Sequence, residues 1–109
     1  MNVRRAIYYR AQHVTGPGCL LLSLRFGVTP TDGPRIVRLL ANGKTQLEVT
    51  FDLSRHISEV LAGVAKANAD FGGALQVEEI EVVPDDYPKK AQAEHAAYRI
   101  AQVVIQGEI

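Results

Sequence analysis

The spacing of the apolar residues changes period along the chain, and this change constrains the fold more than any other feature. In the first half, apolar residues alternate with other residues at Leu20, Leu22, Leu24, Phe26 and Val28. Such alternation is typical of a β-strand with one buried face. Beyond residue 53 the spacing becomes helical, with one stripe that carries Ile57, Val60, Leu61, Val64 and Ala67. The sequence therefore predicts a sheet followed by a helix that packs on it.

A second alternating stretch precedes this strand, over residues 3 to 14. One face would hold Val3, Ile7, Tyr9 and Ala11, and the other Arg4, Tyr8, Arg10 and Gln12. The tetrapeptide that begins at Thr15 and ends at Gly18 then breaks the pattern, because glycine allows positive φ and proline lacks an N–H donor. We therefore predict a β-hairpin.

Residues 35 to 43 leave two interpretations open. Their apolar members fit a helical turn as well as a bent strand: Ile36, Val37, Leu39 and Leu40. We favour a strand. Clear alternation returns over residues 45 to 52, where Leu47, Val49 and Phe51 share one face. This pattern predicts a further half-buried strand.

The predicted helix at residues 54 to 69 has Asp52 or Ser54 available as N-cap and two glycines beyond its end. A strand follows over residues 74 to 83, and its alternation slips between Val77 and Ile80, which indicates either a β-bulge or a strand that is solvated along part of its length. We interpret the acids Glu78, Glu79 and Glu81 on this strand as a solvated face.

The last helix is predicted at residues 91 to 106, with small residues early in its apolar stripe: Ala93, Ala97, Ile100, Ala101 and Val104. The predicted fold is α+β, a single domain in the order β-β-(β)-β-α-β-α. It is a two-layer sandwich of a mostly antiparallel sheet with two helices on one face. The predicted core contains Leu47, Val49, Phe51, Val60, Leu61, Val64, Ile100 and Val104.

Length and composition indicate one ordinary globular domain. The chain has 109 residues, of which 47% are hydrophobic and 22% charged, so it can bury a core. The single cysteine, Cys19, cannot form an internal disulfide, which favours a reducing compartment. We find no signal-peptide pattern and no apolar run of about 20 residues. We therefore expect a cytoplasmic location and no membrane partner.

The charges divide unevenly along the chain although the formal net charge is zero. Residues 1 to 55 hold eight Arg/Lys and three acids, whereas residues 56 to 109 hold four and nine. A basic half could attract phosphate, but nucleic-acid-binding domains usually carry an overall positive excess. Charge alone therefore favours a dipolar surface, or two subunits that meet with opposite signs.

Catalytic and metal-binding patterns are weak. His13, His56 and His95 fall on three separate predicted elements without metal-ligand spacing, so we expect them to be solvated or hydrogen-bonded. Cys19 begins an apolar strand and has no base beside it. The glycine-rich turns lack the lysine and Ser/Thr of a phosphate loop. The adjacent pair Asp85 and Asp86 is a poor acid–base pair. We expect no enzymatic activity, metal or cofactor.

The polar stretch at residues 85 to 90 has a structural and a functional interpretation. Two aspartates followed by Pro88 are strong turn residues just before a helix, and this structural interpretation is favoured. However, Lys89 and Lys90 at a helix N-terminus oppose the helix dipole, so they are poor capping residues. The two lysines could instead contact phosphate.

Residues 57 to 105 resemble the fourth domain of elongation factor G, which has a ribosomal-protein domain-2-like β-α-β fold. The resemblance depends on four features: Gly63 within the helix, the run GGALQVEEIEVV, the loop DDYPKK, and the segment from Ala97 to Ala101. Upstream, QHVTGPG is similar to the family's glycine-rich turn. The resemblance implies a sheet backed by two helices, with a left-handed βαβ crossover. It also implies that residues 15 to 18 and 85 to 90 form one tip.

This chain departs from the family pattern at the polar loop. The family's histidine position is occupied by Lys89, and its Asp-Ser-Ser-Glu sequence corresponds to Gln92, Ala93, Glu94 and His95. The GTPase domain is absent from the sequence, so translocation is not expected of it. The remaining hypothesis is a non-catalytic module that binds RNA or a ribosomal surface through Arg4, Arg10, Thr15, Gly16, Lys89 and Lys90. The alternative is a protein-interaction or homo-oligomeric module, for example a homodimer, without a nucleic-acid role.

Overall fold

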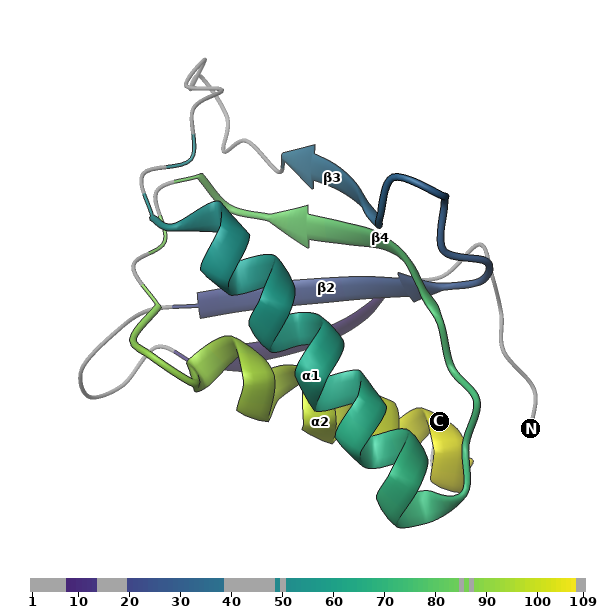
Figure 1. Cartoon of the computed structure of the whole chain (residues 1–109). Helices are drawn as coiled ribbons and strands as arrows, with labels where there is room; N and C mark the ends of the chain where they lie inside the picture. The colour runs from purple at the N-terminus through teal and green to yellow at the C-terminus, as the bar shows by residue number, and fades with distance from the viewer. Residues whose placement is uncertain are drawn as a thin grey trace.

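Three strands precede a helix, a fourth strand and a second helix in the computed structural model of the chain (Figure 1). The structure describes residues 8–13, 20–38, 49, 51–84, 86 and 88–107. The elements are β1 (Tyr9–His13), β2 (Leu20–Phe26), β3 (Arg35–Arg38), α1 (Leu53–Phe71), β4 (Val77–Val82) and α2 (Gln92–Gln106). Both helices lie on one face of the sheet, so the predicted two-layer α+β sandwich is confirmed.

The four described strands are ordered β1-β2-β4-β3. The pairs β1–β2 and β2–β4 are antiparallel, and β3 pairs with β4 in parallel. Residues 35 to 38 are therefore a strand. Most of the predicted strand at residues 45 to 52 lies outside the described residues. Val49, Phe51 and Asp52 are described and are not in a strand, and Asp52 is instead the N-cap of α1.

The connection from β3 through α1 to β4 is left-handed. Figure 1 shows α1 in front of the sheet, β3 above β4, and both strand arrows pointing left. A chain that leaves β3, crosses the front along α1 and re-enters the sheet one strand lower in this view turns in the left-handed sense. Nearly all such crossovers are right-handed, so the handedness is a distinguishing feature of this fold.

The alternation of β2 places its apolar residues against the helices as predicted. Leu20, Leu22, Leu24 and Phe26 are all buried, whereas Val28 is 66% exposed. The strand ends at Phe26, and beyond Gly27 the N–H groups of Val28 and Thr29 bind the side chains of Glu78 and Gln76 instead of the main chain of β4. The predicted bulge in β4 is present: Arg25 pairs with Glu79 but Phe26 pairs with Val77, which leaves Glu78 as the extra residue.

The apolar stripe of α2 is buried as predicted, but that of α1 is rotated relative to the prediction. Leu61 is 38% exposed, and the buried set of α1 is His56, Val60, Gly63, Val64 and Ala67. The rotation follows from the contact between the helices, because Gly63 packs against the main chain of α2. Of the predicted core, Val60, Val64, Ile100 and Val104 are buried. Val49 and Phe51 are partly buried against the core, and Leu47 lies outside the described residues.

His56 differs from the expectation that each histidine would be solvated or hydrogen-bonded. It is 2% exposed, and neither ring nitrogen has a hydrogen-bond partner among the residues that the structure describes. The ring packs against Phe51 with centroids 5.0 Å apart. Burial lowers the pKa of His56 from 6.5 to about 4, so the ring is neutral in the fold at pH 7.

Candidate functional site

The helix-free face of the sheet carries an ion-pair network, which corrects the interpretation of the β4 acids as a solvated face. Glu78 is only 5% exposed and Glu81 only 8%. On β1, Arg10 donates from Nε to Ser23 Oγ and from Nη2 to Glu81 Oε1, each at 2.9 Å. These carboxylates are buried because arginines on the neighbouring strands cover and neutralise them.

Two further arginines extend the network across the sheet. Arg25 on β2 donates to Glu78 at 2.8 Å and to Glu79 at 2.9 Å. Arg35 on β3 donates to Glu79 at 3.0 Å. The hydroxyl of Tyr8 also donates to Glu79, and this hydrogen bond, with the arginines, holds the pKa of Glu79 below its usual value. All four described strands are thus linked by polar side chains.

This network changes the interpretation of the charge asymmetry. Arg10, Arg25 and Arg35 belong to the basic half of the sequence, and their acidic partners belong to the other half. The opposite charges therefore pair within the sheet. Arg10, which the sequence suggested for RNA binding, has its guanidinium bound to Glu81 and is not an unpaired cation.

The polar stretch before α2 lies beside the β1–β2 hairpin. Asp86 is buried, and its Oδ2 accepts a hydrogen bond of 2.8 Å from the N–H of Leu21. Leu20, the preceding residue, forms the last described pair of the hairpin with His13. The described part of the predicted tip thus lies at the hairpin end (Figure 1). Arg4, Thr15 and Gly16 lie outside the described residues, and their predicted role stays a prediction.

Helix α2 begins without a side-chain N-cap, because Ala91 occupies that position with φ 70°. The start of the helix is held by α1 instead. Glu59 Oε2 accepts from the N–H of Ala91 at 3.0 Å, and Arg55 Nη2 donates to the carbonyl of Pro88 at 3.1 Å. The side chains of Lys89 and Lys90 are exposed and form no ion pair within the described part of the chain.

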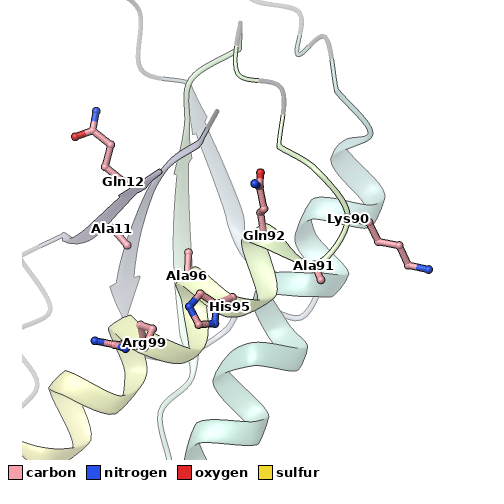
Figure 2. A pocket seen from close by; sticks show the side chains of 8 residues that line it. All are labelled: Ala11, Gln12, Lys90, Ala91, Gln92, His95, Ala96 and Arg99. Atoms are coloured by element: carbon pink, nitrogen blue, oxygen red, sulfur yellow. The ribbon is translucent and has the colours of Figure 1, made fainter. Parts of the chain in front are cut away.

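A groove runs between β1 and α2. One hollow of about 520 Å³ is lined by Ala11, Gln12, Lys90, Ala91, Gln92, His95, Ala96 and Arg99 (Figure 2). A second, of about 370 Å³, is lined by Tyr8, Tyr9, Arg10, Ala11, Arg99, Ile100 and Val103. The hollows share Ala11 and Arg99, so they form one groove along β1. Figure 2 shows Ala11 pointing toward α2, whereas Gln12 and Lys90 point away from the groove.

Sequence reasoning missed this groove. Two of its polar side chains, His95 and Arg99, are one helical turn apart, a spacing that the sequence does reveal. The small residues at positions 11 and 96 create the space, but only the tertiary structure brings them together.

Comparison with protein-family models, curated proteins and solved structures gave no match for this chain. Neither described helix is long and apolar enough to cross a membrane. The described residues also contain no group of three or more His, Cys, Asp or Glu side chains placed to hold a metal ion.

Proposed function

We propose that this domain binds RNA, in solution or on a ribosomal surface, through the end at which the hairpin meets residues 86 to 90. The observation that supports it is the hydrogen bond from Leu21 to Asp86, because it keeps two exposed lysines, which form no ion pair with the described residues, beside the hairpin end. Lysine side chains at such an end bind phosphate as point charges. Arg10, Arg25 and Arg35 contribute little, because Glu78, Glu79 and Glu81 neutralise them.

Binding to mixed-sequence single-stranded RNA at several salt concentrations tests the proposal. Each lysine–phosphate contact releases counterions and contributes about 0.7 to the slope of log K against log salt. The double variant Lys89→Glu/Lys90→Glu should therefore bind more weakly and lose about 1.4 of that slope. Its melting temperature should hardly change, since both side chains are solvated.

The single variant Lys89→Glu should lose about 0.7 of the slope, and its charge-matched control is the variant Lys66→Glu. It makes the same change of charge on an exposed residue of α1. It should leave RNA binding near the wild-type level. Wild-type protein that binds no RNA at low salt, or a double variant that binds as wild type does, would contradict the proposal. A mass that rises with concentration in the same experiments would then favour the self-associating module.

A further inference from the structure

Strand β1 lies at one edge of the described sheet. Strand β1 pairs with β2 on one side and has no neighbour among the described strands on the other. An edge strand presents unpaired N–H and C=O groups that can accept another strand. The other edge of the sheet is less suited to pairing, because β3 has only four residues and ends in the exposed Arg35 and Arg38.

The groove beside β1 is lined by main chain as well as by side chains. Residues 8 to 12, which are consecutive, all border one of its two hollows. Successive side chains of a strand point to opposite faces, so five consecutive residues border the same groove only along the strand edge. Figure 2 agrees, because the side chain of Gln12 points away while the strand itself borders the hollow.

The rest of the groove is small, apolar and cationic. Ala11 and Ala96 leave the space open, and Ile100 and Val103 add apolar surface at the second hollow. Arg99 borders both hollows, and neither hollow is lined by an acidic residue among the described residues. The groove therefore favours a ligand with an extended main chain and negative side chains.

We infer that β1 accepts an extended acidic segment of another protein as an additional strand, with glutamate or aspartate at alternate positions. Its main chain pairs with the edge of β1, and its alternate carboxylates face Arg99 and His95 on α2. A second copy of this chain is a poor occupant, because a symmetric contact would place Arg99 against the partner's equivalent cations. RNA offers no hydrogen-bonding pattern that matches a strand edge.

The probe is a fluorescent peptide of about seven residues that alternates glutamate with threonine, long enough to cover the five residues of β1. Fluorescence anisotropy should show it binding about tenfold more tightly than the same peptide with lysine in place of glutamate. N-methylation of one alternate set of its residues should abolish binding, and N-methylation of the other set should not, because only one set faces β1.

Two protein variants test the groove. Arg99→Glu, on an exposed residue, should weaken peptide binding about tenfold, and Ala96→Leu should weaken it by filling the hollow, with folding checked by circular dichroism. Arg38→Glu, on an exposed residue of β3 at the other edge of the described sheet, should bind peptide as wild type does. The inference fails if the acidic peptide does not bind, if both N-methylated sets bind alike, or if Arg99→Glu changes self-association instead. It also fails if the wild-type protein does not bind the peptide and the Arg99→Glu variant no longer binds RNA. That result would mean that the groove binds nucleic acid.

Discussion

Replacing Gly63 by alanine should destabilise the domain, although alanine is the better helix former. Gly63 lies within α1 where this helix packs against α2. A Cβ atom there would lie well inside 3.0 Å of the carbonyl oxygen of Glu94, and at 3.0 Å from the amide nitrogen of Tyr98. Both atoms belong to the main chain, so no side-chain rotation can relieve the clash. The two helices would have to move apart.

The expected size follows from two opposing effects. Alanine gains about 1 kcal/mol of helix propensity over glycine. Against this, restoring normal van der Waals contact requires the helices to separate by about 1 Å. That movement loosens the core contacts of Ala97 and its neighbours, and overpacking of this kind can cost about 3 kcal/mol. The net loss should be about 2 kcal/mol, or roughly 10 °C in the melting temperature of a domain of this size.

Thermal and urea unfolding followed by circular dichroism measure this loss. The matched control is Ala65→Gly on the exposed side of α1, which should cost about 1 kcal/mol through propensity alone. A Gly63→Ala variant that melts at or above the wild-type temperature would mean that α1 and α2 do not touch at this position. That result would contradict the close contact between α1 and α2 described above.

Two further predictions concern single residues. Burial lowers the pKa of His56 to about 4. Between pH 6.5 and pH 4, His56 therefore binds a proton in the unfolded chain but stays neutral in the folded chain. The free energy of unfolding should therefore fall by about 2 kcal/mol between pH 7 and pH 5, and His56→Leu should remove most of that fall. Ala91→Gly should raise stability by about 1 kcal/mol, because glycine adopts the positive φ of this position without strain. The control Ala62→Gly, within α1, should lower stability. An Ala91→Gly variant that is less stable than wild type would show that the main chain at Ala91 is not strained.

The parts of the fold that depend on local pattern could be predicted from the sequence. The alternation of β2 was assigned correctly from Leu20 to Phe26 but not at Val28, and the apolar stripe of α2 was assigned to the residue, because the apolar face of each element packs in the core. Residues 35 to 43 left a strand and a helical turn open, with the strand favoured, since so short an apolar stretch fits both periods; residues 35 to 38 are a strand, and residues 39 to 43 lie outside the described residues. The exposure of Leu61 depends on how α1 rotates toward α2 around Gly63, which is a tertiary effect.

The candidate sites were harder to predict, because they depend on the strand order. The sequence placed Arg10 and Glu81 on polar faces of their strands, but they are 71 residues apart. Only the pairing of β2 with both β1 and β4 brings their charges together. The groove likewise exists because β1 is at the edge of the described sheet and two alanines face each other across it. Neither the edge position of β1 nor the placement of the two alanines can be read from the residue pattern.

The ion-pair network limits which cations can serve a partner. Arg10, Arg25 and Arg35 are bound to Glu78, Glu79 and Glu81, so these three arginines add no unpaired charge to the helix-free face. Beside β1 and the start of α2, Lys89, Lys90 and Arg99 form no ion pair with any described residue. Arg99 borders the groove, whereas the side chain of Lys90 points away from it. RNA bound at the lysines and a peptide strand bound along β1 would therefore use different cations, and charge reversal at one site should leave binding at the other unchanged.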